Sequence, residues 1–474
     1  MYFEQFYLGC LAHASYMIGS ESIAALVDPR RDVEIYLEEA RKNGLRIEHV
    51  IETHLHADFV SGHRELAART GAKIYLGARA GAQFPHVALF DGDEIRFGHC
   101  RLQFLEAPGH TVESICVLVT DLERSLEPSA VLTGDTLFIG DVGRPDLSPG
   151  YTPQQLAGLL YDSLQQKLLS LPDDLRVYPA HGAGSLCGKQ ISAERYSTIG
   201  QQRATNYALR AASREEFVQM LTEALPERPG YFAGAAELNR AGARPLAELP
   251  PVPALDADAA LRLQSRGALV LDTRPAAQFG AGHVPGSVHI ALSGQFAAWA
   301  GTLIGLETDL VLVAEDSGSV EEARVRLARV GIERVIGYLA GGMEGWKRDN
   351  LVFEEVPQIS VQDLDRLLRE KQEDIRLVDV RLPAEWEEGR IPSATPMPLS
   401  RLVATMSELD RGRLIAVHCK GGYRSSIATS LLQRAGFPRV LNVKGGFDAW
   451  KAAGLPKAKT EPAKVEEHRE QRKL

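Results

Sequence analysis

The sequence predicts a multidomain α/β protein, and three observations lead to that prediction. The chain has 474 residues, too many for one ordinary hydrophobic core, so two to four domains are expected. Short apolar runs alternate with turns and helix-like stretches, which is typical of strands alternating with helices. The second half of the chain also repeats itself, because residues 268–287 match residues 375–394 at a constant offset.

The composition excludes several classes of protein. Hydrophobic residues make up 45% of the chain and charged residues 24%, as in soluble globular proteins. The net charge of −9 favours neither nucleic acid nor an anionic membrane surface as a partner. No apolar run approaches the roughly 20 residues of a membrane span, and the N-terminal segment lacks the pattern of a targeting signal. Five scattered cysteines indicate free thiols, so we expect a cytoplasmic enzyme.

Three blocks and a tail organise the chain. Residues 1–245 form the first block, and a Pro- and Ala-rich passage at 243–260 is expected to be a linker. Two copies of a repeated unit follow at 255–350 and 357–456, each with strand-like runs before helix-like stretches. Residues 457–474 are charged and show no apolar face, so we expect a solvated tail.

Four candidate metal ligands each follow a short apolar run in the first block. Side chains at the ends of several strands can converge on one point, so these residues are expected to meet in space. A lone histidine is usually structural, but several at equivalent positions favour a metal site. The candidates are His54, His110, Asp135 and His181.

The segments THLHAD, PGHT, GDTLF and PAHG, in this order, resemble the metallo-β-lactamase superfamily over most of the first block. The resemblance implies an αββα sandwich. In hydrolases of this superfamily such as glyoxalase II, a His-x-His-x-Asp-His run holds two metals, and its last histidine and the preceding aspartate bind the second. Phe59 stands in place of that histidine, and a phenyl ring cannot coordinate a metal. We therefore expect one metal beside an apolar wall.

The remaining set of His54, His110 and Asp135 has the composition of the facial triad of non-haem Fe(II) oxygenases, which leaves positions open for substrate and O₂. A catalytic zinc also accepts two nitrogens and one carboxylate, so ligand type alone does not decide between the metals. The segments THLHADFVSGH and GDTLFIGDVGRPDL resemble the persulfide dioxygenases, mononuclear iron enzymes that oxidise glutathione persulfide or a similar persulfide to sulfite. This resemblance implies one Fe(II) per chain.

The same resemblance implies a substrate contact at Arg144, at a position that helps to hold the thiol substrate in these enzymes. A guanidinium suits a carboxylate or phosphate, although a salt bridge explains the residue equally well. His56, Asp58 and His181 are then expected to orient the ligands from outside, with Phe59 beside them. The alternative is an unusual dinuclear site that recruits these three residues.

Cys187 lies in a glycine-rich loop shortly after His181 and beside Lys189, so a thiolate there could be stabilised. We hypothesise that it relays sulfane sulfur near the iron, and the alternative is a buried small hydrophobic residue. An unchanged persulfide oxidation and thiosulfate turnover in a Cys187→Ser variant would rule out the relay. The other histidines and cysteines of the block are expected to be structural: His13, His49, His63, His86, His99, Cys10, Cys100 and Cys116.

Cys419, in the second repeat, ends an apolar run and is followed by a glycine-bearing loop and a helix-like stretch. Backbone N–H groups of such a loop and helix N-terminus form an anion cradle, to which Lys420 and Arg424 add positive charge. A thiol in this cradle is expected to be nucleophilic at neutral pH, and a cysteinyl persulfide is stabilised in the same way. The other residues expected to form the cradle are Gly421, Gly422, Tyr423 and Ser425.

Four residues separate Cys419 from Arg424, whereas the loops of protein tyrosine phosphatases and their relatives have five. The shorter loop and the segments DVR, GRIPSA and GGFDAW resemble those of the rhodaneses, whose loop fits a sulfane-sulfur donor. This resemblance implies doubly wound α/β domains. Arg390 and Ser393 depart from the family pattern at positions away from this loop. In the first repeat the cysteine position falls near Glu315 and the arginine is absent, so we expect an inactive rhodanese domain.

Together these resemblances predict a sulfur-metabolism enzyme. The dioxygenase part would convert a low-molecular-weight persulfide, of glutathione or a similar thiol, and O₂ to sulfite. The rhodanese part would make thiosulfate from sulfite and the sulfane sulfur on Cys419, or consume thiosulfate, and tethering raises the effective concentration of the shared product. Two alternatives are a zinc thioester hydrolase of glyoxalase II type and a non-enzymatic sulfane-sulfur carrier or sensor. Homo-oligomerisation is an expectation from the resemblance alone.

Overall fold

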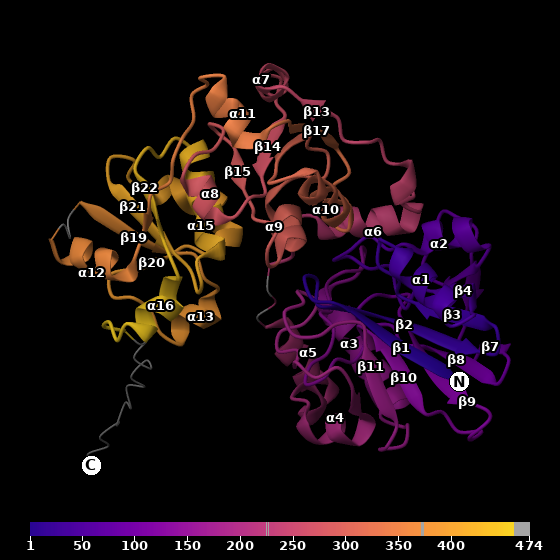
Figure 1. Ribbon diagram of the computed structural model, residues 1–474. Coiled ribbons are helices and arrows are strands. Elements are labelled where there is room, and N and C mark those ends of the chain that lie inside the picture. The colour runs from indigo at the N-terminus through magenta and orange to yellow at the C-terminus, as the bar shows by residue number, and fades with distance from the viewer. Residues whose placement is uncertain (224, 226, 371–373, 459–474) are drawn as a thin grey trace, which may run out of the picture. The chain divides into compact units, whose positions relative to one another are not determined.

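The computed structural model describes residues 1–223, 225, 227–370 and 374–458 (Figure 1). The chain divides into two compact units, each of which is described by itself. One contains Met1–Val252, Gln295–Thr308 and Glu321–Val335, and the other contains Pro253–Gly294, Asp309–Val320 and the described part of Ile336–Leu474. Two segments of the first repeat therefore belong to the same unit as the N-terminal block, which the repeat pattern does not indicate.

Two six-stranded sheets form the N-terminal block, with strand orders β1-β2-β3-β4-β5-β6 and β12-β11-β10-β9-β8-β7. The first contains β1 (Tyr2–Leu8), β2 (His13–Ser20), β3 (Ile23–Val27), β4 (Arg46–Ile51), β5 (Lys73–Gly77) and β6 (Val87–Leu89). The second contains β7 (Glu94–Phe97), β8 (Cys100–Glu106), β9 (Ile115–Asp121), β10 (Ala130–Gly134), β11 (Arg176–Pro179) and β12 (Ser197–Thr198).

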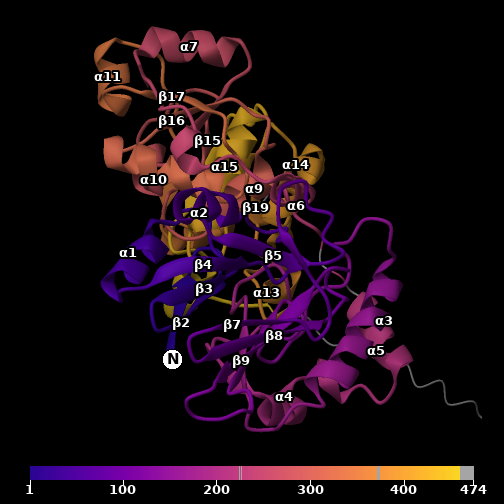
Figure 2. The same ribbon diagram turned by 90° about the vertical axis from the view of Figure 1, so that its right-hand side faces the viewer.

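Side-chain alternation along the strands explains how the sheets stack. In β2, Tyr16 and Ile18 join the core between the sheets, whereas Met17 packs under the outer helices. The first sheet is covered by α1 (Glu34–Lys42) and α2 (His63–Thr70), and the second by α3 (Pro153–Ser163), α4 (Ile199–Thr205) and α5 (Arg214–Thr222). Helices α3 and α5 lie side by side (Figure 2). The predicted αββα sandwich is confirmed.

This unit has further described helical segments, within the sandwich and after it. They are the π-helical turn Leu164–Leu168, the 3₁₀ turns Ala208–Arg210 and Leu246–Glu248, α6 (Phe232–Ala241), α9 (Phe296–Leu303) and most of α10 (Ser317–Ala328). The passage expected to be a linker is structured, because Leu246 and Leu249 are buried against Ala328. Apolar side chains in a Pro-rich segment thus pack onto the domain.

Each repeat forms a five-stranded sheet, and the strand orders are β13-β17-β16-β14-β15 and β18-β22-β21-β19-β20. The strands are β13 (Ala254–Leu255), β14 (Leu269–Asp272), β15 (Val288–His289), β16 (Leu310–Val313), β17 (Val335–Leu339), β18 (Gln358–Ile359), β19 (Ile375–Asp379), β20 (Thr395–Pro396), β21 (Leu414–His418) and β22 (Val440–Val443). The pairings of β14 with β15 and β16, and of β19 with β20 and β21, are parallel. The chain reverses its direction of winding after β15 and β20, as a doubly wound fold requires.

Helices connect these strands in both repeats. They are α7 (Ala257–Ser265), α8 (Ala276–Gly280), α11 (Gly342–Arg348), α12 (Val361–Glu370), α13 (Pro383–Glu387), α14 (Leu402–Thr405), α15 (Tyr423–Arg434) and α16 (Gly446–Ala452), with short 3₁₀ turns at Leu399–Arg401 and Met406–Glu408. The doubly wound α/β prediction is therefore confirmed for both repeats.

The expected tail at 457–474 begins with ordered chain. Ala458 and Arg390 exchange two backbone hydrogen bonds of 2.9 Å, so the tail is paired at its start. Residues 459–474 lie outside the described residues. Within the described part of the chain, every helix is too short or too polar to cross a membrane.

Candidate metal centre and sulfur-transfer loop

The four candidate ligands lie where strands of both sheets end, as predicted. His54 follows β4, His110 follows β8, Asp135 follows β10 and His181 follows β11, and all four side chains are buried. Close packing of the loops depends on Gly143, where a side chain would collide with the Asp135 backbone oxygen and the His110 ring.

His54, His110 and Asp135 bring three buried ligand atoms to one point. Asp135 Oδ2 lies 3.3 Å from His110 Nε2 and 3.9 Å from His54 Nε2. Among the described residues, none of these atoms has a hydrogen-bond partner. Ligand atoms about 2.1 Å from a tetrahedral metal stand about 3.4 Å apart. The spacing and the donor types therefore fit one metal ion held by the predicted triad.

Hydrogen bonds on the far side of each imidazole fix its orientation. His110 Nδ1 donates to the Arg144 carbonyl oxygen at 3.0 Å. His54 Nδ1 lies 3.0 Å from Thr53 Oγ1, whose hydroxyl donates to Asp28 at 2.9 Å, so we assign the imidazole proton to Nδ1. Burial lowers the pKa of both rings and keeps them neutral. Each Nε2 is left with a lone pair for a metal.

His56 has a different environment from the triad histidines. Its Nε2 lies 3.1 Å from Asp28 Oδ1 and 3.5 Å from Glu52 Oε2. Burial lowers the pKa of His56, but the nearby carboxylates, with Asp28 first and Glu52 and Asp58 after it, raise it to about 9 overall. The Nε2 atom of His56 thus faces these carboxylates, in a group separate from the triad, which supports the predicted orienting role.

Phe59 and His13 form an aromatic wall beside these residues. The ring centroid of Phe59 lies 4.3 Å from that of His56 and 4.1 Å from that of His13. The His13 ring also lies 5.7 Å from the His181 ring, so a histidine expected to be structural lies at the site. His13 begins a strand instead of following one, and the search for ligands after apolar runs therefore missed it.

Two side chains in and beside α6 hold the loop that carries Phe59. Asn239 Nδ2 donates to the carbonyl oxygens of His56 at 2.7 Å and Phe59 at 2.8 Å. The Tyr231 hydroxyl donates to the carbonyl oxygen of Asp58 at 3.1 Å. These contacts fix the backbone of the metal loop from a helix that the sequence pattern does not connect with it.

Arg329, which follows α10, contacts the next residue of the same loop. Its backbone oxygen accepts a hydrogen bond from the Val60 amide at 2.7 Å, and its guanidinium bonds both oxygens of Asp32 at 2.7 and 2.9 Å. Nearby, the buried Arg31 pairs with Glu333 at 2.5 Å. The segment Glu321–Val335 thus supports the metal loop, although it belongs to the first repeat in sequence.

We expect an Arg329→Met variant to lose stability and to hold the metal less firmly. The change removes two charge-assisted hydrogen bonds to a mostly buried carboxylate, worth about 2 kcal/mol. The measurements are the melting temperature of the metal-free chain and the rate at which a chelator removes the metal from the loaded chain. In the control, Arg366→Met breaks an exposed ion pair with Asp363 and should change the melting temperature and the rate of metal removal only slightly. Equal effects of the two changes would contradict the supporting role of Arg329.

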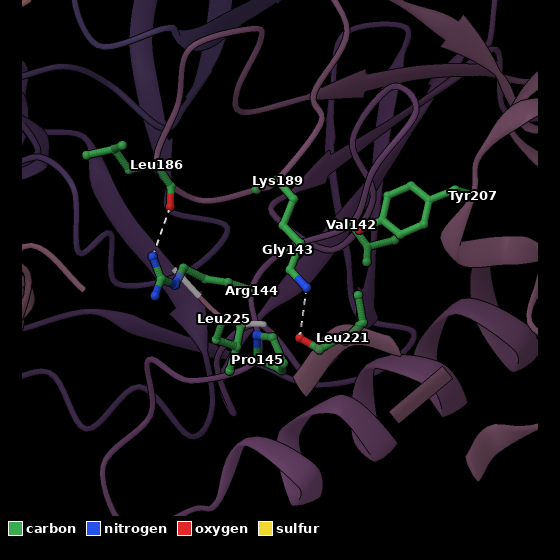
Figure 3. A pocket seen from close by; sticks show the side chains of 10 residues that line it. Val142, Gly143, Arg144, Pro145, Leu186, Lys189, Tyr207, Leu221 and Leu225 are labelled. Carbon is green, nitrogen blue, oxygen red and sulfur yellow. Dashed lines mark hydrogen bonds between the residues drawn. The ribbon is translucent and has the colours of Figure 1, made fainter. Parts of the chain in front are cut away.

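Arg144 is engaged by the protein itself. Its guanidinium bonds both oxygens of Asp146 at 2.7 and 3.0 Å. It also donates to the Leu186 carbonyl oxygen at 3.1 Å (Figure 3). The side chain is buried, and the Arg144 backbone oxygen is the acceptor for His110. The residue therefore positions a metal ligand, and its contact with a substrate stays a prediction.

Cys187 lies at the metal centre. Its Sγ and ligand atoms of Asp135 and His181 all lie within 4.8 Å of one another. Lys189 does not stabilise this thiol, because its Nζ donates to the carbonyl oxygen of Leu221 (Figure 3) and to that of Met220. Burial, and then the charges of the neighbouring carboxylates, raise the pKa of Cys187. The expected thiolate stabilisation by Lys189 is therefore wrong, and the sulfur relay stays a prediction.

Cys419 follows β21, and its loop leads into the N-terminus of α15, as predicted. The Gly422 amide donates to Sγ at 3.1 Å, and Sγ lies 3.6 Å from Ser425 Oγ. Gly422 has a φ of 101°, which favours glycine at this turn. The backbone thus directs an N–H group and a helix N-terminus at the sulfur.

The side chains around this loop are held by other parts of the same unit. The Arg424 guanidinium donates to both oxygens of Glu385, at 2.6 and 2.8 Å. The Tyr423 hydroxyl donates to the Ala291 carbonyl oxygen at 2.9 Å, and Lys420 is exposed. Glu385 is a site residue that the sequence pattern did not indicate.

We expect the pairing of Arg424 with Glu385 to give an acid-sensitive contribution to stability. Burial raises the pKa of Glu385, but the hydrogen bond and charge of Arg424 outweigh it, so the folded pKa lies below the ordinary 4.5. The contribution is therefore present above about pH 4.5 and lost as the pH falls through the folded pKa. Glu385→Gln should lower the free energy of unfolding by about 1 kcal/mol at pH 7.

The measurement is urea denaturation of the wild type and the Glu385→Gln variant at several pH values. Their difference should shrink below pH 4.5, whereas Glu387→Gln, at an exposed position of the same helix, should make little difference at any pH. A Glu385→Gln effect that stays constant down to pH 3 would contradict the ion pair.

The first repeat lacks the nucleophilic cysteine, as expected, but the residue equivalent to Cys419 is one position earlier than the sequence comparison indicated. Val313 is paired in its sheet as His418 is in the second repeat. Ala314 therefore takes the place of Cys419, and Glu315 comes one residue later. The two positions differ by one residue because the strands and the glycine motifs of the two repeats are separated by different numbers of residues, so one alignment offset does not fit both.

Two family models match the chain. The model described as the metallo-beta-lactamase superfamily matches residues 8–181. The model described as a rhodanese-like domain matches residues 256–349 and 360–453. The matches coincide with the sandwich and the two parallel-sheet repeats.

Known proteins are similar to each part. Human persulfide dioxygenase ETHE1, mitochondrial, is 32% identical over 233 residues, which cover 48% of this chain and 82% of the relative. A sulfurtransferase of Allochromatium vinosum is 40% identical over 101 residues, which cover 21% of this chain and 94% of the relative. The crystal structure of a metallo-beta-lactamase from Staphylococcus aureus superposes with a TM-score of 0.64 and 31% identity, covering 71% of this chain and 98% of that one.

Proposed function

The chain belongs to the persulfide dioxygenase family of the metallo-β-lactamase superfamily and continues in two rhodanese-like domains, and from this premise we propose that it couples persulfide oxidation to sulfur transfer. The N-terminal centre would use one Fe(II) and O₂ to oxidise a low-molecular-weight persulfide, such as that of glutathione, to sulfite. The second rhodanese would form thiosulfate on Cys419, or consume it. All five cysteines are free thiols, which supports a cytoplasmic location.

One observation carries the first half of the proposal. The buried ligand atoms of His54, His110 and Asp135 converge on one point, and Phe59 stands where dinuclear hydrolases have a further histidine. Two imidazoles and one carboxylate leave several positions free on an octahedral iron, as the facial triad of oxygenases requires. The arrangement supports a redox-active iron that takes both substrate and O₂.

The surrounding residues hold the metal ligands in place and shield the centre from water. When bound, Fe(II) supplies the redox chemistry by which O₂ oxidises the outer sulfur of the persulfide. The carbonyl of Arg144 and the hydroxyl of Thr53 keep the two ligating imidazoles turned toward the metal. His56 is held between Asp28 and Glu52, so its ring keeps a fixed place beside the Phe59 ring. Phe59 gives the site an apolar side that limits water.

The Cys419 loop supports the second half. The thiolate attacks the outer sulfur of the donor, the sulfur–sulfur bond of the donor breaks, and the donor thiol or sulfite leaves with the electron pair. Sulfite or a thiol then attacks the outer sulfur on Cys419, and the Cys419 thiolate is restored. The Gly422 amide and the N-terminus of α15 stabilise negative charge on the sulfur during both transfers.

The test compares two substrates on one preparation of the full chain, loaded with Fe(II) or with Zn(II). Given glutathione persulfide, the iron form should produce sulfite and thiosulfate, and neither form should hydrolyse S-lactoylglutathione. Thioester hydrolysis by the zinc form without persulfide oxidation by the iron form would favour the glyoxalase II-type hydrolase. No reaction with either substrate would favour a sulfur carrier or sensor.

A further inference from the structure

The helix that follows the nucleophile packs against a strand of the first repeat. Helix α15 lies beside β15 within one compact unit (Figure 1). Near the start of the helix, the Tyr423 hydroxyl donates to the Ala291 carbonyl oxygen at 2.9 Å. At its end, Arg434 donates to the Gly286 carbonyl oxygen at 2.7 Å. The repeat that lacks a nucleophile therefore holds the helix of the repeat that has one.

His289, in β15, makes the hydrogen bond at the centre of this contact. Its Nε2 lies 2.8 Å from the Arg274 carbonyl oxygen, and its Nδ1 lies 2.9 Å from Ser426 Oγ. A carbonyl oxygen only accepts, so we assign the imidazole proton to Nε2. Burial lowers the pKa of His289, and the neutral ring has a lone pair on Nδ1. The Ser426 hydroxyl therefore donates to Nδ1, and both side chains are fixed.

Ser426 lies in the first turn of α15, whose N-terminus faces the sulfur of Cys419. Ser425 Oγ lies 3.6 Å from this sulfur, and the Gly422 amide, just before the helix, donates to it at 3.1 Å. The partial positive charge of a helix N-terminus acts within about one turn, so its effect on an anion depends on the direction of that turn. A hydrogen bond to Ser426 therefore influences the charge that faces the nucleophile.

The corresponding position of the second repeat shows that the repeat fold does not require a histidine there. His289 pairs with Asp272 in its sheet, as Pro396 pairs with Asp379 in the second repeat. Pro396 is exposed, and a proline side chain has no hydrogen-bond donor or acceptor. The two repeats fold alike with a histidine or a proline at this position. The contact with α15 therefore explains the buried ring better than the repeat fold does.

We propose that His289 is a positioning residue for sulfur transfer: through Ser426 it directs the N-terminus of α15 at Cys419 and so prepares the loop for an anionic sulfane-sulfur donor such as thiosulfate. The first repeat, although it lacks a nucleophile, thereby contributes to the sulfurtransferase site. His289 forms no bond to sulfur and keeps its proton on Nε2. The inference rests on the proposed sulfur transfer at Cys419, because the direction of the helix matters to a reaction only there.

The test compares how Cys419 reacts with an anionic and a neutral reagent of similar size. The full chain is treated at pH 7 with iodoacetate or with iodoacetamide, and mass spectrometry follows the alkylation of the peptide that carries Cys419. Ser426→Ala should lower the ratio of the iodoacetate rate to the iodoacetamide rate roughly two- to fivefold, as expected for a charge at a helix terminus. His289→Leu should give the same fall, and the double variant should give no larger one.

The matched control is Ser430→Ala, one turn further along the same helix. Ser430 Oγ accepts a hydrogen bond from the His289 amide at 2.9 Å, so this change also removes a buried bond between α15 and the first repeat. It should lower the melting temperature as Ser426→Ala does, and leave the alkylation ratio unchanged. An unchanged ratio in Ser426→Ala, or an equal fall in Ser430→Ala, would overturn the proposal. A wild type whose Cys419 resists both reagents would overturn it too, because its loop would be closed to donors.

A second measurement separates this inference from the proposed function. The kcat/KM for thiosulfate should fall in Ser426→Ala by the same factor as the alkylation ratio and stay at the wild-type value in Ser430→Ala. A wild type that shows the alkylation effects but takes no sulfur from thiosulfate would refute the proposed sulfur transfer. A Ser426→Ala chain with the wild-type kcat/KM would refute the positioning role.

Discussion

A Cys419→Ser chain is expected to form thiosulfate about a thousandfold more slowly than the wild type, while it still consumes O₂ with glutathione persulfide and accumulates sulfite. Removal of the nucleophile of a covalent mechanism typically costs several orders of magnitude in rate. Cys419 is the cysteine whose sulfur accepts a hydrogen bond from the Gly422 amide, at the N-terminus of a helix. The measurement follows sulfite and thiosulfate by chromatography during one incubation.

Cys100→Ala is the matched control, because it removes a buried cysteine outside both sites. This variant should give the wild-type ratio of thiosulfate to sulfite. Undiminished thiosulfate from the Cys419→Ser chain, after correction for the uncatalysed reaction of sulfite with persulfide, would mean that the metal centre forms the product by itself.

A His110→Ala chain is expected to show the opposite pattern. Loss of one of three ligands should weaken iron binding by at least about 100-fold and remove O₂ consumption. Sulfur transfer from thiosulfate to a thiol should continue, since the Cys419 loop does not use the metal. The measurements are iron content after dialysis, O₂ uptake, and thiosulfate sulfurtransferase activity.

The control for this change is His99→Ala, at an exposed histidine whose charge partners are also at the surface. It should keep iron and both activities. Retained iron and O₂ uptake in His110→Ala would show that the metal is held by another set of residues, and the triad assignment would be wrong.

The triad was predictable because its residues carry a local signal. His54, His110 and Asp135 each follow a strand, and strand ends in a sandwich converge at one edge. The αββα fold and the doubly wound repeats followed from resemblance and from the alternation of strands with helices. The Cys419 loop was predictable for a similar reason, since a strand, a glycine-bearing turn and a helix are adjacent in sequence.

The partners of these residues were not predictable, because they come from distant parts of the chain. Asn239 and Arg329 both bond the backbone of the metal loop, Asn239 with its side-chain amide and Arg329 with its own backbone oxygen, and contacts to backbone groups leave no signal in the residue types of the loop. Glu385 pairs with Arg424 across two elements of the second repeat. His13 escaped notice because it precedes its strand. Each of these contacts depends on tertiary packing and not on local sequence pattern.

The central claim is tested most directly by O₂ uptake of the iron-loaded full chain supplied with glutathione persulfide. One persulfide, one O₂ and one water give the thiol, sulfite and two protons, and a second persulfide is consumed when that sulfite is converted to thiosulfate on Cys419. The Cys419→Ser chain should therefore consume one persulfide per O₂, and the wild type up to two. The metal-free chain and the His110→Ala chain should consume none above the uncatalysed rate. An iron-loaded wild type that takes up no more O₂ than its metal-free form would contradict the account.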